Sequence, residues 1–156
     1  MGQEIERKYL INQEEWKRLI KPTGEFYRQG YILTDPNKTI RIRVTETKAY
    51  LTIKGLSIGA TRPEYEYEIP IPDAKELLDS FSISELSKIR YKITHNSKVW
   101  EVDEFLADNA GLIIAEIELK SENEQFDLPP WVDREVTSEE KYYNSNLTIK
   151  AYTTWK

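Results

Sequence analysis

Charged side chains alternate with large apolar ones along several segments of this chain. Glu64 and Glu66, for example, alternate with Tyr65 and Tyr67. Because side chains at i and i+2 of a strand point to the same side, such a segment is expected to form a β-strand with one charged and one apolar face. The same alternation recurs in segments 4–8, 41–43, 88–92, 101–103 and 116–120.

The charges are sorted by sign from segment to segment. Acidic pairs occupy residues 4–6, 64–68, 101–103 and 116–118, whereas basic pairs occupy residues 41–43 and 88–92. A solvent-exposed face would mix the signs, because like charges on neighbouring strands repel one another. Burying single-sign clusters is tolerable only where the charges pair with one another, with a metal or with a polyanion. We therefore expect the charged faces to point inward, towards a shared wet cavity, and the apolar faces to pack outward against helices.

About eight segments have the alternation, or the β-branched and aromatic content, of strands. They run from Glu4 to Ile11, Phe26 to Leu33, Lys38 to Glu46, Ala49 to Lys54, Arg62 to Ile71, Ser87 to Thr94, Lys98 to Phe105 and Leu112 to Lys120. The sequence therefore predicts a strand-dominated α+β fold, a closed antiparallel β-barrel of about eight strands with flanking helices, which can hold one small ligand. A single domain is expected to span residues 1–156.

Capping signals predict where the helices begin. Asn12 followed by Glu15 is a capping box, and the helix after it would bury Trp16, Leu19 and Ile20.

A second helix is predicted to begin at Asp73, with Pro72 ending the preceding strand. Its Leu77, Leu78 and Phe81 would face inward. Shorter helices are expected near the C-terminus, one opened by Ser121 and one, begun by Thr137 or Ser138, that carries Tyr142 and Tyr143.

Composition excludes several kinds of chemistry. Without cysteine and with a single histidine, His95, the chain has almost nothing from which to build a Cys/His zinc site or a Ser-His-Asp triad. Any metal is expected to be bound by oxygen atoms, which favours Mg²⁺, Mn²⁺ or Ca²⁺. The net charge of -5 argues against a general nucleic-acid or anionic-membrane binder. The lack of cysteine, of a leader and of an apolar run of about 18 residues predicts a cytoplasmic protein.

The segment Glu4-Ile5-Glu6-Arg7-Lys8 resembles the Glu-x-Glu-x-Lys signature of the CYTH domain, the triphosphate tunnel metalloenzyme superfamily. The rest of that family's pattern follows in order over nearly the whole chain. The matching segments are Arg41-Ile42-Arg43, Leu51-Thr52-Ile53-Lys54, Arg62-Pro63-Glu64-Tyr65-Glu66, Lys88-Ile89-Arg90-Tyr91, Val102-Asp103-Glu104-Phe105, Glu116-Ile117-Glu118-Leu119, Glu135-Val136-Thr137 and Tyr142-Tyr143-Asn144.

The resemblance implies a charged tunnel in which carboxylates hold one or two Mg²⁺ or Mn²⁺ ions and basic residues bind a triphosphate. Carried over by position, the implied metal ligands are Glu4, Glu6, Asp103, Glu116 and Glu118. The implied phosphate contacts are Lys8, Arg41, Arg43, Lys54, Lys88 and Arg90, joined by Tyr31, which resembles a tunnel-mouth tyrosine of the bacterial members. Glu64 and Glu66 match a further acidic pair that helps hold a second metal or orients water, and with Glu4, Glu6 and Lys8 they form the implied catalytic group.

The resemblance also implies a reaction, the hydrolysis of inorganic triphosphate to diphosphate and phosphate. This substrate is favoured because it needs no pocket for a base and because the chain has little sequence beyond the barrel. A class IV adenylate cyclase, or a thiamine or nucleoside triphosphatase, would use the same phosphate contacts and stays open. A polyphosphate-binding module without turnover and a structural barrel with solvated charges are the non-enzymatic alternatives. The expected partner is a small-molecule triphosphate, without nucleic acid or membrane, and the chain would act as a monomer or homodimer.

Overall fold

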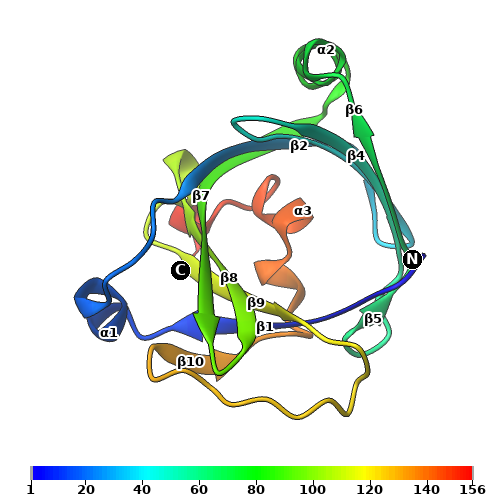
Figure 1. Cartoon of the computed structure of the whole chain (residues 1–156). Helices are drawn as coiled ribbons and strands as arrows, with labels where there is room; N and C mark the ends of the chain where they lie inside the picture. The colour runs from blue at the N-terminus through cyan, green and yellow to red at the C-terminus, as the bar shows by residue number, and fades with distance from the viewer. Residues whose placement is uncertain (1, 156) are drawn as a thin grey trace.

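A computed structural model describes residues 2–155 and shows a ring of antiparallel strands with helices outside it and one short helix within it (Figure 1). The strands are β1 (Glu4–Ile11), β2 (Glu25–Asp35), β3 (Lys38–Val44), β4 (Ala49–Gly55), β5 (Thr61–Arg62), β6 (Glu64–Ile69), β7 (Ser84–His95), β8 (Lys98–Phe105), β9 (Ile113–Glu118) and β10 (Val132–Glu135). The helices are α1 (Gln13–Arg18), α2 (Ile71–Phe81) and α3 (Asn144–Leu147), with the 3-10 turns η1 (Ala107–Asn109), η2 (Glu140–Tyr142) and η3 (Tyr152–Thr154).

The strands pair around the ring in the order β1-β9-β8-β7-β2-β3-β4-β6, and every neighbouring pair is antiparallel. The ring closes because β6 continues backwards through Pro63 into β5, which pairs with β1 at Glu4 and Ile5. The backbone N–H of Glu6 adds a hydrogen bond of 3.0 Å to the carbonyl of Ala60. Strand β10 pairs with the same edge of β1 further along, opposite Tyr9. The predicted closed barrel is therefore confirmed.

The period-two pattern located the strands well, with two exceptions. β1 and β8 have the predicted bounds. The segment predicted as one strand from Arg62 to Ile71 is divided at Pro63, which lacks the N–H that an unbroken ladder needs, and its second part ends at Ile69. β10 was not predicted, because its sequence Val-Asp-Arg-Glu is short and mostly polar.

Two apolar clusters pack against the outside of the ring. One lies over β1, β8 and β9 and contains Trp16 from α1, Trp100 from β8 and Trp131. The ring centroid of Trp131 lies 5.6 Å from that of Trp16 and 5.9 Å from that of Trp100, both in edge-to-face contacts. The other joins Ala74 and Leu78 of α2 to Ile42 of β3 and its neighbours. Burial of these side chains outside the ring leaves the interior free for polar groups.

A third apolar cluster lies at one end of the interior. Leu86, Phe105 and Ile114 are on the same strand faces as the charged residues two positions away, and they pack against Leu147 of α3 and Tyr142 of the preceding turn. In Figure 1, α3 lies within the outline of the ring. The C-terminal segment therefore fills one end of the barrel.

The outer face of β6 departs from the prediction that the apolar faces pack against helices. Tyr65 and Tyr67 are 50% and 58% exposed. Their partners across the ladder are Ile53 and Leu51 of β4, and Ile53 is also exposed. The prediction is wrong here because α2 packs on β2, β3 and the neighbouring end of β4.

Helix α1 begins as predicted, with the Asn12 side chain accepting a hydrogen bond of 3.1 Å from the Glu15 N–H. Trp16 is buried, but Ile20 is 96% exposed. The prediction of a buried Ile20 is wrong because the helix ends at Arg18, so Ile20 no longer continues its apolar stripe.

Helix α2 begins at Ile71 rather than at the predicted Asp73, and Pro72 sits in its first turn instead of ending β6. A proline is tolerated there because the first N–H groups of a helix have no partner within it. Phe81, predicted to face inward, is 59% exposed at the end of the helix. Gly30 of β2 faces α2, and a Cβ on it would lie 2.8 Å from Leu78 Cδ2, so glycine allows the helix to approach this closely.

The two helices predicted near the C-terminus are shorter than expected. Residues 121–124 form a turn, and the segment after Thr137 contains η2, the single turn of α3 and η3. Among residues 2–155, the helices are all too short or too polar to cross a membrane.

Replacing a buried residue of α2 should destabilise the fold far more than replacing the exposed residue at its end. Leu78→Ala removes a side chain that is 2% exposed, so the free energy of unfolding should fall by about 2 to 5 kcal/mol. Phe81→Ala, on the same helix, should cost less than about 1 kcal/mol. Urea unfolding followed by tryptophan fluorescence measures both, and equal losses would contradict the packing described here.

Candidate functional site

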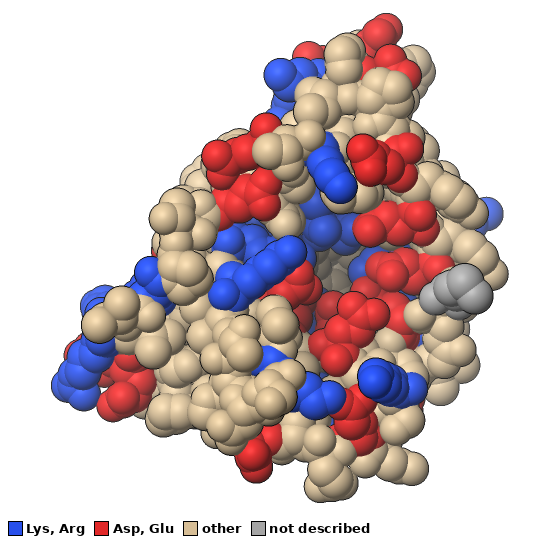
Figure 2. All heavy atoms as spheres, in the orientation of Figure 1, with Lys and Arg blue, Asp and Glu red and all other residues tan. Residues whose placement is uncertain are grey.

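The charged strand faces enclose one cavity of about 220 Å³ inside the ring. Figure 2 shows it as a hollow in the middle of one face, with acidic side chains gathered along one side and basic side chains deeper on the other. The lining contains seven carboxylates and seven cationic side chains. All the residues selected from the sequence line it except Asp103: Glu4, Glu6, Lys8, Tyr31, Arg41, Arg43, Lys54, Glu64, Glu66, Lys88, Arg90, Glu116 and Glu118.

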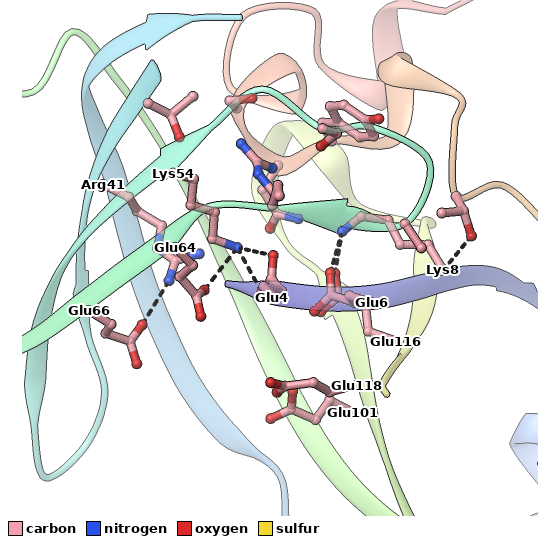
Figure 3. A pocket seen from close by; sticks show the side chains of 18 of the residues that line it. Glu4, Glu6, Lys8, Arg41, Lys54, Glu64, Glu66, Glu101, Glu116 and Glu118 are labelled. Atoms are coloured by element: carbon pink, nitrogen blue, oxygen red, sulfur yellow. Dashed lines mark hydrogen bonds and ion pairs between the residues drawn. The ribbon is translucent and has the colours of Figure 1, made fainter. Parts of the chain in front are cut away.

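Carboxylates from adjacent strands lie directly opposite one another on the acidic side. Glu6 of β1 is paired with Glu118 of β9, and Glu116 of β9 is paired with Glu101 of β8. Figure 3 shows Glu101 and Glu118 next to each other, below Glu6 and Glu116. Burial, and then the charges of Glu116 and Glu4, raise the pKa of Glu6 to about 8. The carboxylates of this wall are so close together that Glu6 loses its proton less readily than a carboxyl group in water does.

Lys54 of β4 connects two of the carboxylates near the start of β1. Its Nζ lies 3.1 Å from Glu4 Oε1 and 3.4 Å from Glu64 Oε2 (Figure 3). Burial disfavours the charged form of Glu4, but Lys54, a hydrogen bond with Glu64 and the charge of Lys8 together hold the pKa of Glu4 below its ordinary value. Burial and the charge of Glu4 raise the pKa of Glu64. The strands on either side of the β5–β1 closure are thus joined by ion pairs.

Glu116 forms ion pairs with two cations on different strands. Lys8 of β1 donates a hydrogen bond to its Oε2, and Arg90 of β7 lies 3.1 Å from its Oε1. Burial opposes ionisation of Glu116, but Lys8, Arg90 and Lys88 hold its pKa well below the ordinary value. Although burial disfavours the charge on Lys8, Glu116 and Glu6 hold the pKa of Lys8 above its ordinary value. Both groups are therefore ionised at neutral pH.

Asp103 lies behind the cavity wall instead of in its lining. Its carboxylate is 1% exposed and forms a bidentate pair with Arg90, at 2.7 Å from Nε and 2.8 Å from Nη2. Lys88 Nζ is 2.8 Å from the same carboxylate. Burial lowers the pKa of Lys88 to about 7, although Asp103 opposes this. In this structure Asp103 orients two cations of the cavity.

Two arginines of β3 face the cavity from the basic side. Arg41 Nη2 donates to Thr52 Oγ1 at 3.1 Å and to Glu66 Oε2 at 3.2 Å, but its buried Nε has no hydrogen-bond partner among the described residues. Arg43 Nε donates to Gln29 Oε1 at 3.1 Å. Burial, and then Arg41 and Arg90, lower the pKa of Arg43 to about 10. These guanidinium groups repel one another and would be relieved by an anion.

Several neutral residues of the site had no signal in the sequence. The Tyr27 ring lies between two arginines, 5.1 Å from the Arg43 Cζ and 5.2 Å from the Arg90 Cζ. Gln29 is fully buried and joins Arg43 to Asn144 of α3. Glu101 is different, since it shares the alternation of Asp103 and could have been found from that pattern.

The acidic wall has the donor chemistry for a hard divalent cation, since all of its side-chain donors are carboxylate oxygens. No three such side chains are already gathered into a metal-binding cluster among residues 2–155, and the predicted ligands Glu4, Glu116 and Asp103 form ion pairs with lysines and arginines. The raised pKa of Glu6 marks the place where positive charge is lacking. The residues of this wall therefore fit an oxygen-bound cation such as Mg²⁺ or Mn²⁺.

Comparisons with known proteins agree with this arrangement. Residues 2–152 match the CYTH domain. The chain is 48% identical over 157 residues to an inorganic triphosphatase of Acetivibrio thermocellus, covering 100% of this chain and 99% of that protein. It is 32% identical over 155 residues to an inorganic triphosphatase of Nitrosomonas europaea, covering 94% and 97%.

Solved structures show the same fold. A crystal structure of an inorganic triphosphatase superposes with a TM-score of 0.63 and 27% identity, covering 93% of this chain and 97% of that one. A putative adenylate cyclase from Bacillus halodurans superposes with a TM-score of 0.64 over 78% of this chain and 84% of its own. Its 22% identity supports the shared fold alone.

Without metal, the protein should become more stable as the pH falls from 7 to 5. A carboxyl group whose pKa is higher in the folded chain than in the unfolded one takes up a proton on folding, and Glu6 has values of about 8 and 4.5. Lys88, with a folded pKa of about 7 against 10.5, acts mainly above pH 7 and offsets only a small part of this gain below it. Groups with lowered pKa values, such as Glu116, lose stability only near and below pH 4.5. The gain should be about 2 to 3 kcal/mol, because one proton contributes up to about 1.4 kcal/mol per pH unit.

Urea unfolding in EDTA at a series of pH values measures this gain. Glu6→Gln is the matched control, because it removes the titrating group and should remove most of the dependence. Saturating Mg²⁺ should flatten the wild-type profile, since a bound cation favours the ionised carboxylate. A metal-free profile that is flat or falls towards pH 5 would contradict the arrangement of carboxylates described above.

Proposed function

Because the chain belongs to the CYTH domain family, we propose that it hydrolyses inorganic triphosphate to diphosphate and phosphate in its charged cavity, with Mg²⁺ or Mn²⁺ as cofactor. The names of the two curated relatives support this activity, and they match the chain over nearly its full length. The observation that carries the proposal is the cavity itself, which has a volume of about 220 Å³ and in which guanidinium and ammonium groups face a wall of carboxylates. A small polyanion with a divalent cation supplies the charge that each wall lacks.

The basic wall binds the phosphate oxygens in this proposal. A planar guanidinium offers parallel N–H donors to phosphate, and Arg41 has a buried Nε–H that no described residue accepts. Arg43 and Arg90 are fixed beside it by Gln29 and Asp103. Lys54, Lys88 and Lys8 add compact charges. Such preorganised cations stabilise a transferring phosphoryl group without having to move during the reaction.

The acidic wall holds the cofactor. Glu4, Glu6, Glu116 and Glu118 provide the oxygen donors, with Glu101 beside them and Asp103 acting through the cations that it orients. When bound there, a divalent cation neutralises phosphate charge and activates water for attack. The water oxygen forms a bond to the terminal phosphorus and gives up a proton to solvent, the bond from that phosphorus to the bridging oxygen breaks, and diphosphate leaves. Glu64 and Glu66 hold Lys54 and Arg41 in position across the cavity.

The balance of charge in the cavity predicts that triphosphate and the divalent cation strengthen each other's binding. Seven carboxylates and seven cations leave almost no excess of either sign when all are ionised. A triphosphate bound alone would be repelled by the acidic wall, and a cation bound alone would be repelled by the basic wall. When both are bound, the cation neutralises charge on the acidic wall and the triphosphate neutralises charge on the basic wall. Binding of each should therefore strengthen binding of the other.

Turnover should require the acidic wall but not the acidic residues outside it. Glu4→Gln and Glu6→Gln should each abolish triphosphate hydrolysis, because each removes a ligand of the cation, while the fold is kept. Glu68→Gln is the matched control, since Glu68 lies on the same face of β6 as Glu66 but is exposed and does not line the cavity. Phosphate release with Mg²⁺ or Mn²⁺ measures activity. Loss of folding in both cavity variants would instead favour a structural role for these carboxylates.

Arg41→Ala should chiefly weaken binding of triphosphate, by about 1.5 to 3 kcal/mol for a lost charge-assisted hydrogen bond. Arg28→Ala is the control, because Arg28 pairs with Glu85 and Asp79 on the outside of the barrel. Isothermal titration calorimetry with triphosphate gives both affinities. Equal effects of the two substitutions would contradict a specific phosphate contact at Arg41.

The substrate is identified by comparing triphosphate, ATP and thiamine triphosphate in parallel assays for phosphate, diphosphate and cyclic AMP. Phosphate and diphosphate from triphosphate, at a kcat/KM well above that for the other two, is the expected result. Cyclic AMP from ATP would replace the proposal with an adenylate cyclase.

A further inference from the structure

The C-terminal segment contributes a side chain to the site that the proposed mechanism does not use. Tyr143, Asn144 and Ser145 all line the cavity, and Asn144 is the first residue of α3. The Asn144 Oδ1 accepts two hydrogen bonds, one of 2.8 Å from Lys88 Nζ and one of 3.1 Å from Gln29 Nε2. A single amide oxygen therefore joins α3 to two strands of the barrel.

The bond to Lys88 fixes the direction of a deeply buried ammonium group. Lys88 is 1% exposed, and its only other polar contact among the described residues is Asp103, at 2.8 Å. An ammonium group held by one carboxylate can still swing about that contact, because its three N–H donors are equivalent. The second acceptor, on the opposite element, removes this freedom and fixes where Nζ stands at the cavity wall.

The hydrogen bond from Gln29 links Asn144 indirectly to Arg43, because Gln29 also accepts a hydrogen bond from that arginine. Gln29 is fully buried, and its amide uses both ends: Nε2 donates to Asn144 and Oε1 accepts from Arg43 Nε. Because Asn144 presents an oxygen, the Gln29 amide must turn its nitrogen towards α3 and its own oxygen towards Arg43. Asn144 thereby selects the Gln29 orientation that orients the arginine.

We propose that Asn144 is a positioning residue for triphosphate binding, which orients Lys88 directly and Arg43 through Gln29 so that both cations face the same bound anion. This inference rests on the proposed function of the cavity. Lys88 lies on β7 and Arg43 lies on β3, and within residues 2–155 only the Asn144 oxygen receives hydrogen bonds from both branches, so no other described residue can replace it.

The test compares two asparagines of the same short helix. Asn144→Ala removes both hydrogen bonds. The KM and Kd for triphosphate should rise roughly tenfold and kcat should change much less, because about two hydrogen bonds to an uncharged acceptor are lost. Asn146→Ala is the matched control, because Asn146 Nδ2 donates to the Glu140 carbonyl at 2.6 Å and does not line the cavity. It should keep the wild-type KM. Calorimetric Kd values for triphosphate in EDTA give a readout that needs no metal and no turnover.

Gln29→Met completes a double-mutant cycle with Asn144→Ala. It cuts the branch to Arg43 and leaves α3 and Lys88 in place, so it should raise the Kd several-fold, and Asn144→Ala should then cost less than it does in the wild type. Strictly additive effects, or a wild-type Kd in either single variant, would overturn the inference. If Asn144→Ala does not fold, Gln29→Met alone tests the link, and an unchanged Kd in that variant overturns it. A wild-type protein that binds triphosphate but never hydrolyses it would overturn the proposed function and leave this test of Asn144 valid.

Discussion

Each charge that the ring of strands turns inward needs a partner of opposite sign, and this requirement organises the interior. Lys88 and Asp103 are both 1% exposed, and an unpaired ion at that depth would cost several kcal/mol. Arg90 pairs with Asp103 of β8 and Glu116 of β9, and Lys54 pairs with Glu4 of β1. The Arg90–Asp103 pair joins the neighbouring strands β7 and β8, and the other two pairs link strands that are not neighbours in the ring.

The hydrophobic stabilisation of the fold is located mainly where it does not compete with this network. The tryptophan cluster beneath α1 and the cluster beneath α2 are both outside the ring. Each strand thus has one face for stability and one for binding. This division allows charged residues to occupy the centre of the molecule, where a globular domain normally places its apolar core.

The strand positions and most of the cavity residues could be predicted because both depend on a period of two. Glu4, Glu6 and Lys8 share a face of β1, the observed register places Glu118 opposite Glu6 and Glu116 opposite Lys8, and closure of the ring collects these faces around one cavity. Features set by packing between distant segments could not be predicted in this way. Ile20 has the spacing of a buried helical residue, yet α1 ends before it.

The neutral members of the site were missed for a related reason. Asn144 belongs to a segment that matches the family's pattern, but neither it nor Gln29 was given a role, because both are uncharged and their contacts between β2, β7 and α3 arise only in the folded chain. Asp103 shows the opposite case. Its alternation with Glu101 is clear in the sequence, but Glu101 lies in the lining, whereas Asp103 lies behind it, paired with Arg90 and Lys88.

The apolar cluster formed by Leu86, Phe105, Ile114 and the C-terminal segment gives the barrel a floor. A ligand in the cavity therefore does not pass through that end of the barrel. If a linear ligand lies along the barrel axis and is cut into two pieces, the piece nearer the closed end can leave only after the outer piece. For such a ligand, the shape of the cavity would set the order in which the two pieces leave.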